Sequence, residues 1–241
     1  MFRQKFAAGI ALAFALVIGV QTNVLAFGRV KNQKTFKVRI ENISAPDGVI
    51  TEGGAKYPFA LSPGLFVVNH RKNYFFNTGE KADQALEAQA EDGNPEFLSK
   101  KYLTKVGSVF MGIFNTPVGS DKASPILPGG AFEFSFTANV GMRLSLIAMF
   151  GQSNDLFYAP KQAIDLFDED GNPLTGDITD RLLLWDAGTE VNQAPGLGDE
   201  QGPRQKMPNT GKAENGNVGL VKDGFTYPNT KDVLRVTITA E

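Results

Sequence analysis

The most regular pattern along the chain is an alternation of apolar and polar side chains near both of its ends. Residues 36–41 alternate apolar and charged side chains, and residues 233–239 repeat the alternation. A period of two is typical of a strand with one buried face. Residues 132–137 alternate phenylalanine with polar residues in the same way. The pattern predicts strands at both ends of one folded unit and between them.

Continuous apolar runs predict further strands that are buried on both faces. The runs at residues 106–114 and 144–150 have the length of strands. Glycine and proline separate the runs, as at residues 127–130. Many short strands joined by such turns favour a mainly β fold, an antiparallel two-sheet β-sandwich.

Two segments depart from the strand pattern. Residues 81–91 are rich in Ala, Gln and Glu at helical spacing and are followed by Asp92 and Gly93 as a stop signal, which predicts a helix. Residues 94–105 predict a second short helix, and we expect both as a short helical insertion over one end of the sandwich. Residues 193–223 are rich in Gly, Pro and Asn with almost no periodicity, and a loop of that length is functional or mobile. We expect at most a short strand in it, near residues 217–221.

The first 26 residues have the layout of a secretory signal peptide. Arg3 and Lys5 precede an apolar run over residues 6–20, and Ala26 is the small residue at the cleavage position. The run is shorter than the roughly 20 residues of a membrane-spanning helix. We expect cleavage after Ala26, a single mature domain over residues 27–241 without a transmembrane segment, and a secreted or periplasmic location in a bacterium. An uncleaved membrane anchor is the alternative.

The composition excludes several kinds of catalytic site, metal site and partner. The chain has no cysteine and one histidine, which excludes disulfides, thiol nucleophiles and metal sites with several histidines. Without Arg3 and Lys5, 22 basic residues remain against 26 acidic ones, a net charge of −4. A mildly acidic chain without a Lys/Arg cluster offers little to a nucleic acid, so we expect no nucleic-acid partner.

The strongest candidate for chemistry follows the apolar run that carries the only tryptophan. Trp185 is followed by Asp186 and, four residues later, by Glu190. The flexible Gly188 between them lets the chain curl so that both carboxylates face one point. Carboxylate oxygens that face one point suit a hard cation, and calcium is the usual one outside the cell. A solvated turn with two unrelated charges is the alternative.

Four segments together resemble the spondin domain, the module shared by F-spondin and many exported bacterial proteins. They are FALSPG (59–64) with the apolar strand that ends at His70, GE (79–80) leading into LEAQAEDG (86–93), LSLIAMF (144–150) with SNDLF (153–157), and WDAGTEVN (185–192) with PG (195–196). The most specific part is Asp-Ala-Gly-Thr-acid preceded by Ser-x-Asp-x-Phe. The resemblance covers nearly the whole chain from Lys34 onward.

The resemblance implies an antiparallel β-sandwich and a non-enzymatic extracellular module. In F-spondin-like members one calcium ion lies at the loop end, and by position its ligands become Asp155, Asp186 and Glu190. Asp155 also follows directly on an apolar strand, so three carboxylates from two strand ends would meet at one rim. Glu190 stands where the family has Asp, and Asn154 and Leu156 stand where it has Pro and Trp.

We therefore expect an exported calcium-binding module for recognition or adhesion, with a lipid head group, a glycan or a protein as its partner. A metal-assisted hydrolase that uses the same acids and a purely structural calcium site are the alternatives.

His70, the only histidine, is interpreted as structural, with a hydrogen bond near the helical insertion. The acidic residues 165–173 are interpreted as a hairpin turn, because the glycine that an EF-hand loop requires is missing.

Overall fold

The computed structural model describes residues 33–50, 53–54, 56–72, 75–103 and 110–241. Asn32–Glu241 form one compact unit. The predicted signal peptide and its cleavage site at Ala26 lie outside the described residues, so both stay predictions. In the part of the chain that the structure describes, no helix has the length and apolar character needed to cross a membrane.

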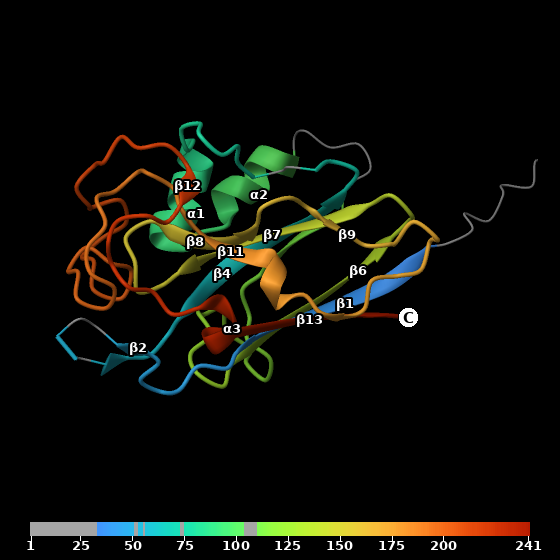
Figure 1. Ribbon diagram of the computed structural model, residues 1–241, viewed down its shortest axis with the longest axis horizontal. Coiled ribbons are helices and arrows are strands. Elements are labelled where there is room, and N and C mark those ends of the chain that lie inside the picture. Colours follow the sequence, from blue (N-terminus) through green and yellow to red (C-terminus); the bar gives the residue numbers. More distant parts are fainter. Residues whose placement is uncertain (1–32, 51–52, 55, 73–74, 104–109) are drawn as a thin grey trace, which may run out of the picture. The chain divides into compact units, whose positions relative to one another are not determined.

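Two antiparallel sheets form this unit and confirm the prediction of a mainly β sandwich (Figure 1). The smaller sheet has the order β10 (Gly176–Asp177), β13 (Leu234–Ala240), β1 (Lys34–Asn42) and β6 (Ala131–Ala138). The larger sheet has the order β12 (Gly219–Leu220), β11 (Leu182–Asp186), β8 (Leu156–Pro160), β7 (Arg143–Phe150), β4 (Leu61–Asn69) and β5 (Phe110–Phe114), and β9 (Ile164–Asp165) also pairs with β7. Strands β2 (Val49–Ile50) and β3 (Lys56–Tyr57) pair with each other.

The first and last strands of the unit lie side by side in the smaller sheet. Val38 of β1 stands opposite Ile238 of β13 on one side and Phe134 of β6 on the other. Their alternating patterns turn one apolar face toward the larger sheet, which explains why both strands were recognisable from sequence.

The larger sheet is covered on both faces. Phe66 and Val68 of β4 pack in the core between the two sheets, whereas Leu65 and Val67 pack in a second core under the helices. A strand buried on both faces needs apolar residues at every position, so β4 and β7 appear in the sequence as continuous runs. The predicted strand over residues 106–114 is described only from Phe110 onward, where β5 begins.

The predicted helical insertion is present as α1 (Gln84–Asp92) and α2 (Glu96–Leu103). Figure 1 shows both helices on the side of the larger sheet away from β1 and β13. The expectation that the insertion lies over one end of the sandwich was wrong. Leu86 and Leu98 are fully buried in the second core, so the helices cover the outer face that the apolar runs of the sheet would otherwise expose.

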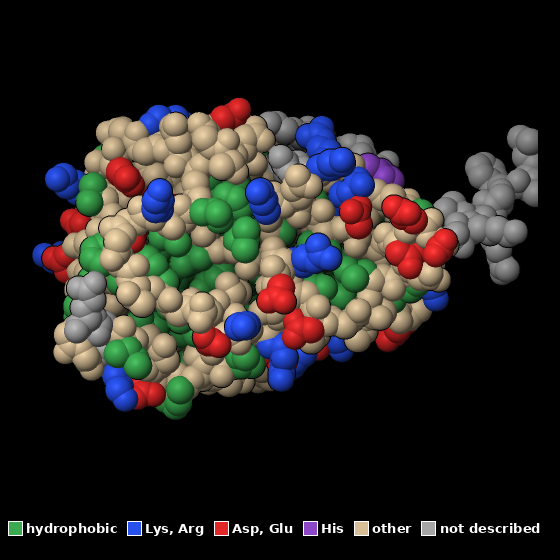
Figure 2. Space-filling model, viewed as in Figure 1, with side chains coloured by type: hydrophobic (Ala, Val, Ile, Leu, Met, Phe, Trp, Pro, Cys, Tyr) green, Lys and Arg blue, Asp and Glu red, His purple; other side chains and the backbone are tan. Residues whose placement is uncertain are grey.

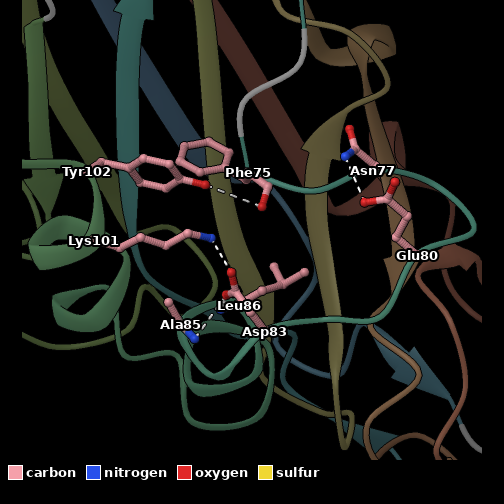
Figure 3. A network of polar contacts seen from close by, with 8 residues as sticks. All are labelled: Phe75, Asn77, Glu80, Asp83, Ala85, Leu86, Lys101 and Tyr102. Carbon is pink, nitrogen blue, oxygen red and sulfur yellow. Dashed lines mark hydrogen bonds and ion pairs between the residues drawn. The ribbon is translucent and has the colours of Figure 1, made fainter. Parts of the chain in front are cut away.

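Helix α1 is capped at both ends, and its N-cap also ties it to α2 (Figure 3). Oδ1 of Asp83 accepts hydrogen bonds from the backbone N–H groups of Ala85 and Leu86, both at 3.1 Å. Lys101 of α2 forms an ion pair with the same Asp83. Gly93 ends the helix in the left-handed conformation, with φ of 61°, as the sequence predicted.

Two shorter helical turns complete the unit: η1 (Thr179–Arg181) and α3 (Thr230–Val233). The predicted hairpin in the acidic segment is confirmed, because Phe167 and Pro173 form a β-bridge and Oδ1 of Asp168 accepts a hydrogen bond from the backbone N–H of Asn172 at 2.8 Å. The short strand expected near residues 217–221 is β12.

His70 lies at the end of β4, away from the place that the sequence analysis gave it. Its Nδ1 lies 3.1 Å from the carbonyl oxygen of Gly141, in the turn between β6 and β7. Asn69, the residue before His70, pairs with Arg143 at the start of β7, which brings His70 to this turn. The expected hydrogen bond near the helical insertion is therefore replaced by one with the turn.

The cap of α1 gives a stability prediction. Asp83→Ala removes the acceptor for two N–H groups and should lower the free energy of unfolding by about 1 kcal/mol. For a domain of this size, that lowers the melting temperature by about 2–4 °C. Asp83→Asn keeps the cap and loses only the exposed ion pair with Lys101, so its loss should be smaller. Equal losses in the two variants, measured by thermal unfolding, would contradict the capping role.

Candidate metal centre

Neighbouring strand ends bring two of the predicted site residues to one edge of the larger sheet. Asp155 directly precedes β8, and Asp186 is the last residue of β11. In the antiparallel ladder of these strands Asp186 stands opposite Leu156, and the N–H of Ala187 donates to the carbonyl of Asp155 at 3.2 Å. The two carboxylates therefore come from rigid, hydrogen-bonded backbone.

A third carboxylate joins them from the long loop. Asp155, Asp186 and Glu214 each present a carboxylate oxygen, and these atoms all lie within 4.8 Å of one another. Asp155 is fully buried, Asp186 is half-buried and Glu214 is exposed. We call these three residues the acidic cluster. It is a group of carboxylates that could hold a metal ion.

Glu214 is placed by backbone hydrogen bonds between two loop segments. Its N–H donates to the carbonyl of Thr189 at 2.9 Å, and the N–H of Gly216 donates to the carbonyl of Gly188 at 2.7 Å. Gly188 has φ of 68°, which a glycine adopts without strain. Glu214 was not among the predicted site residues, because it lies in the aperiodic segment 193–223. The length of that segment was the only sign in the sequence that the segment has a function.

Asp155 has one satisfied and one unsatisfied oxygen. Its Oδ2 accepts hydrogen bonds from the N–H of Thr189 at 2.7 Å, from the Thr189 hydroxyl at 3.1 Å and from the N–H of Glu190 at 3.1 Å. Its Oδ1 is buried and has no hydrogen-bond partner in the described part of the chain. Burial, together with the negative charge of Asp186, raises the pKa of Asp155 to about 7. Such an oxygen requires a proton or a cation.

Asp186 is oriented by its own loop. Its Oδ1 accepts a hydrogen bond from the N–H of Gly188, and its Oδ2 accepts one from Nδ2 of Asn192, both at 2.7 Å. The amide oxygen of Asn192 is buried without a partner among the described residues. Burial also raises the pKa of Asp186. Two oxygen atoms near the Asp186 carboxylate, Oδ1 of Asp155 and the amide oxygen of Asn192, thus lack hydrogen-bond donors.

Glu190, the third predicted ligand, lies next to the acidic cluster and is not a member of it. Its backbone N–H binds Asp155, whereas its side chain is 3% exposed and points to other partners. Oε1 accepts a hydrogen bond from the N–H of Gly211 at 2.7 Å, and Oε2 lies 3.4 Å from Nδ2 of Asn154. Its role as a metal ligand stays a prediction.

The donor set consists of oxygen atoms only. Carboxylate and amide oxygens suit calcium, magnesium or manganese, whereas zinc and copper sites usually include nitrogen or sulfur ligands. The chain has no cysteine, and its one histidine lies at the opposite end of the β4–β7 ladder. The residues present therefore fit a hard cation.

A scan of protein-family models finds none that matches the chain, and a search of curated proteins finds no match either. The resemblance to the spondin domain stays a prediction based on the residues quoted above.

The buried carboxyl of Asp155 predicts an unusual pH dependence for the metal-free protein. Its pKa is near 3.8 when unfolded and about 7 when folded, so between these values the folded state holds a proton that the unfolded state has lost. The free energy of unfolding in EDTA should therefore fall as the pH rises from 5 to 7. The loss is a few kcal/mol at most, because one pKa unit corresponds to about 1.4 kcal/mol.

Asp155→Asn should flatten this decline and make the metal-free protein more stable at pH 8. The amide can keep one oxygen for the Thr189 donors and place its NH₂ group where Oδ1 now has no partner. Asp170→Asn, in the exposed hairpin of residues 167–173, is the matched control and should leave the decline unchanged. Urea unfolding at several pH values measures the effect, and wild-type stability that rises between pH 5 and 7 would contradict it.

Proposed function

We propose that this chain is an exported, calcium-binding β-sandwich module that acts in recognition or adhesion at a bacterial surface or in the periplasm, and that it is not an enzyme. The observation that carries the proposal is Oδ1 of Asp155, a fully buried oxygen without a hydrogen-bond donor inside a group of three carboxylates. A divalent cation at this place would neutralise the negative charge on Oδ1 of Asp155, which no hydrogen-bond donor in the described part of the chain contacts.

The proposed ligands are Asp155, Asp186 and Glu214, with Glu190 retained from the sequence analysis as a further candidate. Calcium takes six to eight oxygen ligands, so backbone carbonyls and water would supply the rest. A bound calcium ion would hold the two loop segments of the cluster against the start of β8. The likeness to spondin domains, which implies calcium at the same sheet edge, agrees with this assignment.

Exposed apolar side chains in the part of the chain that also carries Glu214 support a recognition role. They lie in the segment that follows Asp186 and are 38–63% exposed: Val191, Leu197, Met207 and Leu220. Binding residues often lie on loops that a rigid scaffold positions, and apolar side chains exposed together there would offer a contact surface. Figure 2 shows Lys/Arg and Asp/Glu side chains interspersed on one face, a distribution that supports a partner other than a nucleic acid.

No observation favours the hydrolase alternative. A metal-assisted hydrolysis needs a general base beside the metal-bound water, and histidine is the most frequent one. His70 lies at the other end of the sheet, with its ring nitrogen on the carbonyl of Gly141. A binding module requires no such group.

Calcium should stabilise the exported protein against heat. At a concentration one hundred times its dissociation constant, calcium adds about 2.7 kcal/mol to the free energy of unfolding. For a domain of this size the melting temperature should rise by roughly 5–11 °C relative to EDTA, with a smaller rise for magnesium. Asp186→Asn should abolish the rise, and Asp170→Asn should retain it. Absence of any rise in the wild-type protein would remove the metal from the proposal.

The recognition role predicts calcium-dependent binding through the exposed apolar residues. The immobilised protein would be exposed to phosphatidylserine vesicles and to a glycan array, each in calcium and in EDTA. We expect binding to one of these in calcium and its loss in EDTA. The double variant Leu197→Ser with Met207→Ser should weaken it at least tenfold. Val140→Ser, an apolar residue 45% exposed at the opposite end, is the control and should bind normally. Equal binding by all three proteins would exclude this rim as the contact surface.

A further inference from the structure

A cavity of about 280 Å³ lies beside the C-terminal end of α1, and no residue of the acidic cluster lines it. Its walls come from the start of β4, the end of β7, the loop before β6 and the long loop of residues 193–223. A concave, mainly apolar surface with a few polar groups is the usual form of a small ligand site. The apolar side chains that line this cavity are Ala60, Pro63, Pro125, Leu127, Met149 and Pro203.

Asp92, the last residue of α1, is the only charged residue among those that line the cavity. Its Oδ1 accepts hydrogen bonds from Nε2 of Gln205 at 3.0 Å and from the N–H of Asn209 at 3.3 Å. Its Oδ2 accepts no hydrogen bond from the described residues. The cavity therefore carries one negative charge that no Lys or Arg on its walls balances, and a cationic ligand would complement it.

The neutral polar side chains of the cavity also leave acceptors for a ligand. The Ser62 hydroxyl donates to the carbonyl of Pro63 at 2.6 Å, so its proton is already used within the protein. The amide NH₂ group of Gln205 faces Asp92, which leaves Oε1 of Gln205 as an acceptor. A ligand that brings N–H donors would satisfy both Oδ2 of Asp92 and Oε1 of Gln205.

The composition of the walls decides which cation fits. A quaternary ammonium group is usually held by aromatic side chains, and no aromatic residue lines this cavity. A guanidinium group favours a carboxylate with both oxygens free, whereas Oδ1 of Asp92 already serves Gln205 and Asn209. A primary ammonium group is a compact charge that a single oxygen can hold. The four-carbon stem of lysine would lie along the apolar walls.

We propose that this cavity is a docking site for a lysine side chain of a protein partner, with the ammonium group on Oδ2 of Asp92. Leu127 is 54% exposed, so the apolar wall is accessible to a partner. An ethanolamine lipid carries the same ammonium group on only two carbons, and its phosphate would then meet apolar walls. The inference rests on the proposed recognition role and deepens it by naming the group that the partner presents, but it does not depend on calcium.

Gly202 gives a way to fill the cavity without changing its charge. A Cβ at position 202 would lie 3.4 Å from Cε of Met149 and 3.5 Å from the carbonyl oxygen of Gly151, which are ordinary contact distances. The backbone of Gly202 is not in the left-handed region, so a larger side chain is compatible with its conformation. Gly202→Leu should therefore fill the cavity and leave Asp92 in place.

Titration of the ¹⁵N-labelled protein with capped tripeptides in EDTA tests the site by nuclear magnetic resonance. A peptide with a central lysine is compared with one carrying norleucine, which keeps the stem without the charge, and one carrying diaminopropionic acid, which keeps the charge on a short stem. We expect the lysine peptide to shift the amide resonance of Gly151 and to bind about tenfold more tightly than either of the others. Asp92→Asn, which keeps an oxygen for Gln205, and Gly202→Leu should each weaken binding about tenfold. Asp170→Asn, in the exposed hairpin, is the matched control for net charge and should bind normally.

Three results would overturn the inference: equal affinity for the lysine and norleucine peptides, binding that Asp92→Asn leaves unchanged, or no binding of the lysine peptide at all. Sedimentation with phosphatidylethanolamine vesicles that Gly202→Leu abolishes, without binding of the lysine peptide, would assign the cavity to a lipid instead. Circular dichroism checks the folding of each variant, and Gly202→Leu decides the matter if Asp92→Asn does not fold. Because the titrations are made in EDTA, failure here leaves the calcium site standing, and failure of calcium to stabilise the protein leaves the lysine site standing.

Discussion

Burying a carboxylate is unfavourable unless donors or a cation face both of its oxygens, and Asp155 meets this requirement on one side only. Its Oδ2 collects three donors from Thr189 and Glu190, which joins the start of β8 to the loop after β11. Its Oδ1 has no partner in the described chain. The same residue thus fixes the geometry of the loop end and leaves a negative charge there. Asp186 and Glu214 stand around that charge, and the three carboxylates form a group that could hold a metal ion.

The second organising feature is a sheet that is buried on both faces. Its inner face packs on the smaller sheet and its outer face packs under α1 and α2, so the strands next to the acidic cluster are held from both sides. Trp185 belongs to the outer core, and its Nε1 donates to the carbonyl of Ala159 at 2.9 Å. This fixes the end of strand β11 directly before the Asp186 side chain. A rigid support of this kind lets carboxylates stay close together despite their repulsion.

Much of the fold could be predicted from sequence, because strands with one or two buried faces have distinct periodicities. Asp155 and Asp186 could be predicted as neighbours for the same reason, since each adjoins an apolar strand. The place of Glu190 could not, because the left-handed turn at Gly188 interrupts the alternation of side chains and sends the Glu190 carboxylate toward Gly211. Glu214 could not be predicted either, since its loop is held by backbone hydrogen bonds and by the distant Lys81 side chain on the carbonyls of Asn215 and Gly216, and neither leaves a local sequence pattern. The helices were recognised by their spacing and cap, but the face they cover depends on packing that spacing does not encode.

The pairing of Glu190 with Ala213 has a consequence for how this protein can diversify. Val191 donates from its N–H to the carbonyl of Lys212 at 2.8 Å, so the two ends of the segment between them are held together next to the cluster. The entropy of closing a loop grows only with the logarithm of its length, about 0.6 kcal/mol for each doubling. Insertions at the exposed tips of this segment therefore cost little and do not reach the carboxylates. Evolution could change the shape of this loop while the three carboxylates beneath it keep their places.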